Sequence, residues 1–168
     1  MNKKNKQIGP MTIALTALAA YAVLQVVIIA AWSNPLTVRL ILTPEFGQSQ
    51  KLIDVWTVLQ PLPLISQQPP LAMMAGFFLY SLLHVAAFVS LFSVIPGSRW
   101  KSKGMAFGLG ILVFQYGYFE FFGPFNLFGE PIRLLAYEIL MLALMAFSEA
   151  LVISRLLTPK LQVQEANT

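Results

Sequence analysis

The sequence lacks cysteine, has a single histidine and is poor in charged residues. Without cysteine, the chain has no disulfide, no zinc–thiolate site, no iron–sulfur cluster and no thiol nucleophile. The single histidine, His84, excludes a haem held by two histidines of one chain, and no metal site is predicted. Only 11% of the residues are charged, whereas a soluble domain has roughly 25%. This composition excludes a disordered chain, a nucleic-acid-binding module and an ordinary water-soluble enzyme.

Long apolar runs dominate what is present. The 168 residues are 57% hydrophobic, and a helix that crosses a bilayer needs about 20 apolar residues. Four runs reach or approach this length: residues 11–32, 71–95, 104–122 and 131–157. Pro131 is expected at the first helical position of the last run, and Pro159 just beyond its end. We therefore predict an all-α fold, with residues 1–168 forming one polytopic membrane domain of four transmembrane helices in an antiparallel bundle.

The positive charges are unevenly distributed along this predicted topology. Eight of the eleven Lys and Arg residues fall on one side of the predicted membrane domain: Lys3, Lys4, Lys6, Arg99, Lys101, Lys103, Arg155 and Lys160. The positive-inside rule places both termini in the cytoplasm, in a multi-pass protein of the plasma (inner) membrane. Basic clusters beside apolar runs also attract anionic headgroups. The lipid bilayer is therefore the predicted partner, and nucleic acid is not.

Residues 33–70 form the long loop on the predicted outer side. Within it, residues 49–60 have helical periodicity, with four apolar residues on one face: Leu52, Val55, Trp56 and Leu59. This pattern predicts a short amphipathic helix on the outer surface, acting either as a lid or as a gate or docking surface. Residues 61–70 contain four prolines and are expected to run extended. Residues 36–43 are predicted to form a strand or an extended strap.

Ionisable side chains inside predicted spans are candidates for function, because they are costly to place in a bilayer. Glu138 and Glu149 are 11 residues apart on the last span, so they face nearly the same way with about 16 Å between them along the helix axis. We predict a polar column facing the bundle interior, made of Gln25, His84, Gln115, Glu138 and Glu149. It would be a proton or cation path, a ligand site, or a set of interhelical hydrogen bonds.

Two further patterns concern helix packing. Glu120 is near the outer end of the third span and Arg133 is in the first turn of the fourth, so we predict a structural ion pair between them, with Glu130 as a second candidate partner of Arg133. Gly104 and Gly108 have the spacing that permits close helix contact, for which the alanine-rich first span is the candidate neighbour. Such small-residue faces also allow contact with a protein partner or with a second copy of the chain.

The sequence contains no convincing catalytic constellation and names no cofactor. Ser81 lies three residues before His84, but the sequence has neither a G-x-S-x-G elbow nor an H-E-x-x-H motif. The first functional hypothesis is a non-catalytic subunit, or a ligand-binding or ion-binding transport element, that uses the polar column. The second is a membrane enzyme acting on a lipid, quinone or isoprenoid, with His84 and Glu138 as acid–base residues. The third is a purely structural or assembly subunit.

Overall fold

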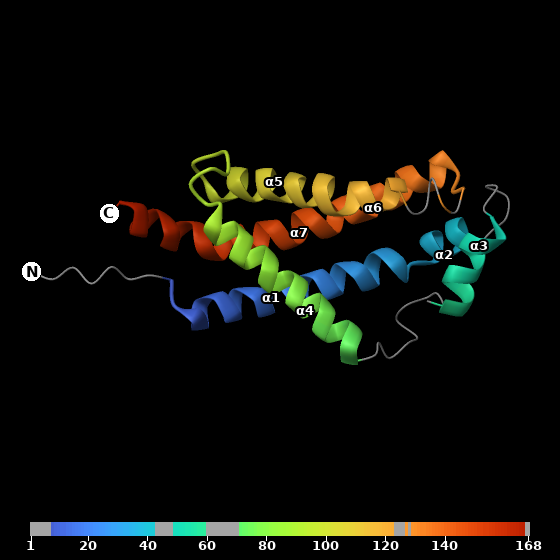
Figure 1. Cartoon of the computed structure of the whole chain (residues 1–168), viewed down its shortest axis with the longest axis horizontal. Helices are drawn as coiled ribbons and strands as arrows, with labels where there is room; N and C mark the ends of the chain where they lie inside the picture. Colours follow the sequence, from blue (N-terminus) through green and yellow to red (C-terminus); the bar gives the residue numbers. More distant parts are fainter. Residues whose placement is uncertain (1–7, 43–48, 60–70, 123–126, 128, 167–168) are drawn as a thin grey trace, which may run out of the picture. The chain divides into compact units, whose positions relative to one another are not determined.

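The computed structural model describes residues 8–42, 49–59, 71–122, 127 and 129–166, and the regular elements in these residues are all helices (Figure 1). The four main helices are α1 (Pro10–Trp32), α4 (Leu71–Ser90), α5 (Trp100–Ile111) and α7 (Ile132–Glu165). Both α1 and α7 are long and apolar enough to cross a membrane. The all-α prediction is therefore confirmed for the described residues, while the four-span bundle stays a prediction.

The shorter elements are α2 (Pro35–Leu42), α3 (Gln50–Asp54) with the π-helical segment η2 (Val55–Leu59), and the π-helical segment η4 (Leu112–Gly117) followed by α6 (Tyr118–Glu120). A helix is thus present where residues 49–60 predict one. The amphipathic face of this helix stays a prediction, because three of its four side chains lie outside the described residues: Leu52, Trp56 and Leu59. Residues 61–70 and the N-terminal lysines also lie outside them: Lys3, Lys4 and Lys6.

The prediction of a strand or strap at residues 36–43 is wrong, because residues 35–42 form α2. Asn34 caps this helix, since its Oδ1 accepts a hydrogen bond from the backbone N–H of Thr37 at 2.9 Å. Pro35 occupies the first helical position, where its missing N–H removes no helical hydrogen bond. These two signals outweigh the β-branched side chains within the segment.

The end of α7 also differs from the prediction. Pro159 lies inside the helix, which continues to Glu165. A proline in a helix interior removes one hydrogen bond and crowds the preceding turn. Tertiary contacts hold the segment beyond it: Leu161 is part of a buried apolar cluster, and Gln162 Nε2 donates to the carbonyl of Ser98 at 2.6 Å. The helix therefore continues past a residue that usually stops one.

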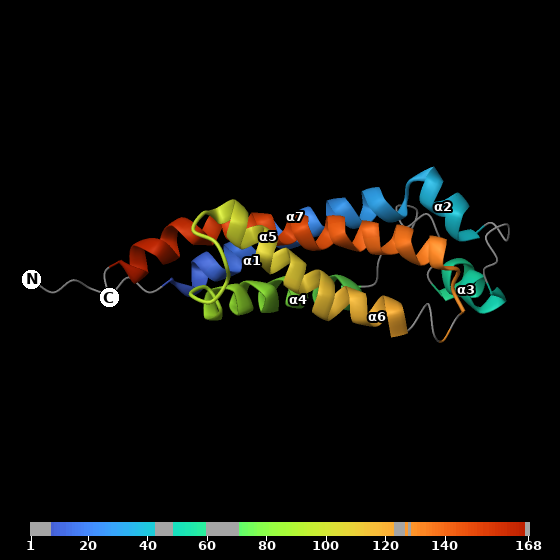
Figure 2. The same cartoon turned by 90° about the horizontal axis from the view of Figure 1, so that it is seen from above.

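The chain divides into two compact units. Unit 1 comprises the described residues of 1–24, 70–109 and 147–168, and unit 2 comprises those of 25–69 and 110–146. In unit 1, α1, α4 and α7 pack around one apolar cluster (Figures 1 and 2). Its members are Ala17, Ala20, Val85, Phe88, Phe92, Ile95, Ile153, Leu157 and Leu161. Segments from the start, the middle and the end of the chain thus share one core.

The turn from α4 to α5 in unit 1 is closed by a buried lysine. Here α4 ends at Ser90, five residues before the predicted end of that run. Lys103, in the first turn of α5, is only 6% exposed. Its Nζ donates to the carbonyls of Phe92 at 2.6 Å and Ile95 at 2.8 Å, and lies 4.2 Å from the centroid of the Phe92 ring. Lys103 is therefore not a headgroup-facing charge, because its ammonium satisfies carbonyls that follow α4.

Close packing at Gly104 and Gly108 is present, but the neighbour is α7 and not the first span. A Cβ on Gly108 would lie 2.6 Å from Phe147 Cδ1 and 3.2 Å from Ala150 Cβ. A Cβ on Gly104 would lie 3.0 Å from a methyl carbon of Leu151. The spacing correctly indicates a close approach. It does not specify the partner, because α1, α4 and α7 all carry small residues.

We expect Gly108→Ala to lower the free energy of unfolding by about 1–3 kcal/mol, because the added methyl group overpacks the α5–α7 contact. Gly110→Ala is the matched control, since a Cβ there meets nothing within 4 Å and alanine favours a helix over glycine by roughly 1 kcal/mol. Chemical denaturation of both proteins in detergent measures the difference. Equal effects of the two substitutions would contradict the packing argument.

In unit 2, hydroxyl groups connect α2 with α7. Thr37 Oγ1 donates to the carbonyl of Ala31 at 2.6 Å and accepts from Asn34 Nδ2 at 2.7 Å. The hydroxyl of Tyr137 lies 2.5 Å from Thr37 Oγ1. Because the Thr37 proton is already used, Tyr137 is the donor of this bond. The cap of α2 is thereby linked to the first half of α7.

Candidate functional site

Three polar side chains meet between α4 and α7 inside unit 1. Ser81 and His84 are three residues apart and share a face of α4. Ser81 Oγ donates to Oε1 of Glu149 at 2.7 Å, and His84 Nδ1 lies 2.9 Å from Oε2. Ser81 and Glu149 have no exposed surface, and the His84 side chain is 11% exposed. Glu149 thus has a partner on each carboxylate oxygen, and of the three side chains only the imidazole has exposed surface.

The cluster pairs a carboxyl group with an imidazole. A buried carboxylate is strongly disfavoured unless it is paired and hydrogen-bonded, and Ser81 and His84 supply both. With protons on both ring nitrogens of His84, the imidazolium and the carboxylate of Glu149 sum to zero charge. When the imidazole loses one proton, the cluster carries one negative charge. Histidine is the side chain best suited to such a change near neutral pH.

Aromatic rings surround the imidazole. The Phe107 ring of α5 lies edge-on to His84, with 6.5 Å between ring centroids and an interplanar angle of 89°. Tyr80, on α4, lies 6.4 Å from His84 in a tilted arrangement. Phe107 in turn packs against Phe88 of the core at 5.2 Å. Both distances from the imidazole are within the range of favourable aromatic pairs.

The structure brings together two of the five residues of the predicted polar column, His84 and Glu149. Gln25, Gln115 and Glu138 belong to unit 2, where Glu138 is 2% exposed. The Gln25 amide nitrogen is buried and has no hydrogen-bond partner among the described residues. The continuous column from Glu149 to Glu138 stays a prediction.

The predicted ion pair between Glu120 and Arg133 also stays a prediction. The side chain of Glu120 lies outside the described residues, and Arg133 is exposed at the start of α7. Glu130, the second candidate partner of Arg133, is 2% exposed. Within the described residues, no group of three or more His, Asp or Glu side chains is placed to hold a metal ion.

Sequence reasoning missed Ser81 as a partner of Glu149. From the sequence, Ser81 was assessed only as a nucleophile with His84 as its base, whereas in the structure Ser81 is hydrogen-bonded to Glu149. The hydroxyl of Ser81 donates to the carboxylate of Glu149. The signal in the sequence is the three-residue spacing between Ser81 and His84, which lets both side chains reach one acceptor on a neighbouring helix.

Comparisons of the chain with models of protein families, with curated proteins and with solved structures found no match.

Proposed function

We propose that this chain is a non-catalytic integral membrane element that binds and releases a proton at the His84–Glu149 pair as part of a transport path. The observation that carries the proposal is the full burial of Glu149 between Ser81 and His84 of a neighbouring helix. Ionisable groups inside a membrane are expensive, so they mark ion and proton pathways by default. This pair is protonatable, hydrogen-bonded and reachable through the imidazole.

The membrane placement is supported by apolar side chains on the outside of every main helix. Leucines at four positions are more than half exposed: Leu15 of α1, Leu83 of α4, Leu109 of α5 and Leu140 of α7. Large exposed apolar surface is rare in soluble monomers, whereas in a bilayer these side chains face acyl chains. The 20 residues of α4 extend about 30 Å, enough to cross the hydrocarbon core. We therefore propose that the chain crosses the plasma (inner) membrane four times, with both termini cytoplasmic. The third crossing would use α5 together with η4 and α6, since the 12 residues of α5 extend only about 18 Å.

The enzyme hypotheses have less support. A serine nucleophile needs a hydrogen bond to its base and access for a substrate. Ser81 donates to Glu149 and not to His84, and both Ser81 and Glu149 are completely buried. For an acid–base role of His84, the carboxylate that the structure places against the imidazole is that of Glu149. A purely structural role of the cluster predicts different results in the experiment below.

Reconstituted liposomes that enclose a pH-sensitive dye test the proposal directly. A potassium gradient with valinomycin sets the potential, and the rate of proton entry is recorded. Glu149→Gln keeps the size of the side chain and an acceptor for Ser81, but has no carboxylate to pair with an imidazolium. We expect at least a tenfold slower proton entry in this variant, roughly the effect of losing a positioned proton-transfer group.

Glu165→Gln is the matched control, because Glu165 is an exposed carboxylate on the same helix. It should leave the rate of proton entry unchanged. Wild-type liposomes no faster than empty ones, or undiminished entry with Glu149→Gln, would overturn the proposal. In that case, a lowered thermal stability of Glu149→Gln would assign the cluster a structural role. Purification in mild detergent as a stable heteromeric complex would favour an assembly subunit.

A further inference from the structure

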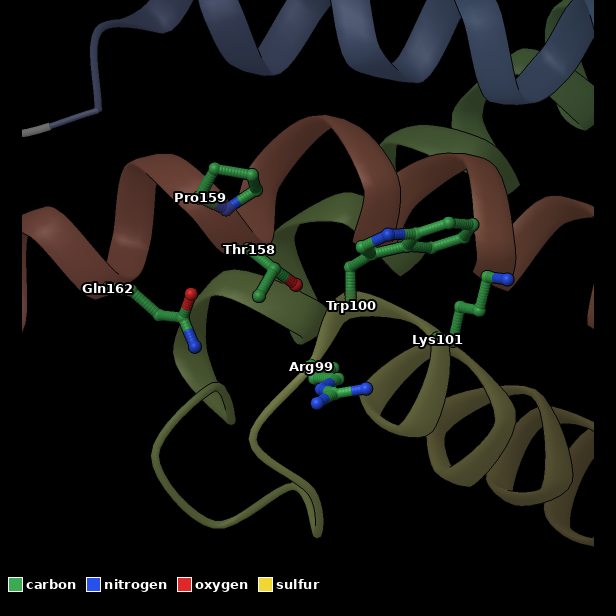
Figure 3. A pocket seen from close by; sticks show the side chains of 6 residues that line it. All are labelled: Arg99, Trp100, Lys101, Thr158, Pro159 and Gln162. Atoms are coloured by element: carbon green, nitrogen blue, oxygen red, sulfur yellow. The ribbon is translucent and has the colours of Figure 1, made fainter.

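A pocket lies within unit 1, between the start of α5 and the last third of α7 (Figure 3). Its volume is about 360 Å³, within the roughly 300–1,000 Å³ of ligand sites in proteins. Six residues line it: Arg99, Trp100, Lys101, Thr158, Pro159 and Gln162. The pocket is separate from the Glu149 cluster, since Thr158 lies nine residues further along α7, or about 14 Å along the helix axis.

Two cationic residues, Arg99 and Lys101, line this pocket, and the rest of its wall is more apolar than polar. Arg99 and Lys101 are exposed, and none of the six lining residues is acidic. The indole of Trp100 is flanked by two cations, with the Lys101 ammonium 5.6 Å and the Arg155 guanidinium 5.0 Å from the ring centroid. The backbone N–H groups at the start of the 12-residue helix α5 add partial positive charge on the same side. The pocket is therefore complementary to an anion.

The walls of the pocket are fixed before any ligand arrives. Ser154 Oγ donates to the carbonyl of Trp100 at 2.7 Å, and Gln162 Nε2 donates to the carbonyl of Ser98 at 2.6 Å. These two bonds fasten the turn before α5 to α7. The hydroxyl of Thr158 lies 3.0 Å from Ser154 Oγ on the same helix. A pre-organised wall reduces the entropy that a ligand must overcome to bind.

We propose that this pocket binds the phosphate of an anionic phospholipid headgroup. Arginine and lysine together are suited to phosphate oxygens, and tryptophan is favoured at the depth of lipid headgroups. Under the orientation set out above, the pocket lies in the cytoplasmic leaflet, where anionic lipids attract basic segments. A soluble phosphate compound would meet the same chemistry, so the experiment separates the two sources.

Native mass spectrometry of the full chain in neutral detergent tests the proposal. The protein is mixed with equal amounts of phosphatidylglycerol and phosphatidylcholine, and the bound lipid is counted over a titration. We expect one phosphatidylglycerol per chain to bind in preference to phosphatidylcholine. Arg99→Gln and Lys101→Gln should each weaken its binding about fivefold, as expected from the loss of one basic residue at a headgroup.

Lys160→Gln is the matched control, because Lys160 is an exposed cation on α7 that does not line the pocket. It should change the binding much less than Lys101→Gln. An equal loss of phosphatidylglycerol binding with Lys160→Gln would overturn the proposal, because it would show general attraction between charges and not binding in the pocket. A second titration, with excess inorganic phosphate present, separates the two kinds of ligand. Phosphatidylglycerol that stays bound supports a lipid headgroup site, whereas displacement of phosphatidylglycerol by phosphate overturns the proposal.

Discussion

Lys103→Met is expected to lower the free energy of unfolding by about 2–4 kcal/mol. Lys103 is 6% exposed, and its ammonium donates to the carbonyls of Phe92 and Ile95. Methionine preserves the length and the apolar stem of the side chain but has no donor. Each buried carbonyl that loses its partner costs about 1–3 kcal/mol. Chemical denaturation in detergent, followed by circular dichroism, measures the change.

Lys101→Met provides the control for this prediction. Lys101 is two residues earlier on α5 and exposed, so its loss should change stability by no more than about 0.5 kcal/mol. The difference between the two variants isolates the buried donor from the loss of one positive charge. A similarly small change with Lys103→Met would mean that other groups satisfy the carbonyls of the α4–α5 turn.

Local sequence signals predict the main helices of this chain. The places where the structure departs from these predictions depend on contacts between distant segments. Residues 11–32 are predominantly apolar and carry no charge, and α1 begins one residue earlier than this run and ends with it. The prediction of a strand or strap at residues 36–43 did not use the neighbouring Asn34 and Pro35, whose types favour a helix start and explain why α2 is a helix. The passage of α7 through Pro159 was not visible, because it depends on Leu161 and on the bond from Gln162 to another segment.

The candidate site was also only partly predictable from the sequence. His84 and Glu149 stand out because ionisable groups in an apolar run need a compensating interaction. The sequence does not reveal that Glu149 meets Ser81 and His84 together, since this depends on how α7 packs against α4. Lys103 carried an unused signal: a cation in the first turn of a helix is disfavoured by the dipole of that helix, which suggests a partner elsewhere.

Glu149→Leu is expected to destabilise the protein by about 3 kcal/mol, well above the average of about 0.6 kcal/mol for an interhelical hydrogen bond in a membrane. The reason is that leucine leaves two buried groups, Ser81 Oγ and His84 Nδ1, without their acceptor. Removing one partner of a buried polar pair exposes the full desolvation cost of the other. The denaturation assay used for Lys103 measures this change.

The variant Ser81→Ala/His84→Leu/Glu149→Leu should recover most of that loss, to within about 1 kcal/mol of the wild type, because all three polar groups are replaced together. The same variant should remain without proton entry in liposomes. Recovered stability without recovered proton entry would mean that the cluster adds little to the net stability of unit 1. The role of the cluster would then be proton binding and not the stability of the fold. If the triple variant is as unstable as Glu149→Leu, the three side chains instead hold α4 against α7.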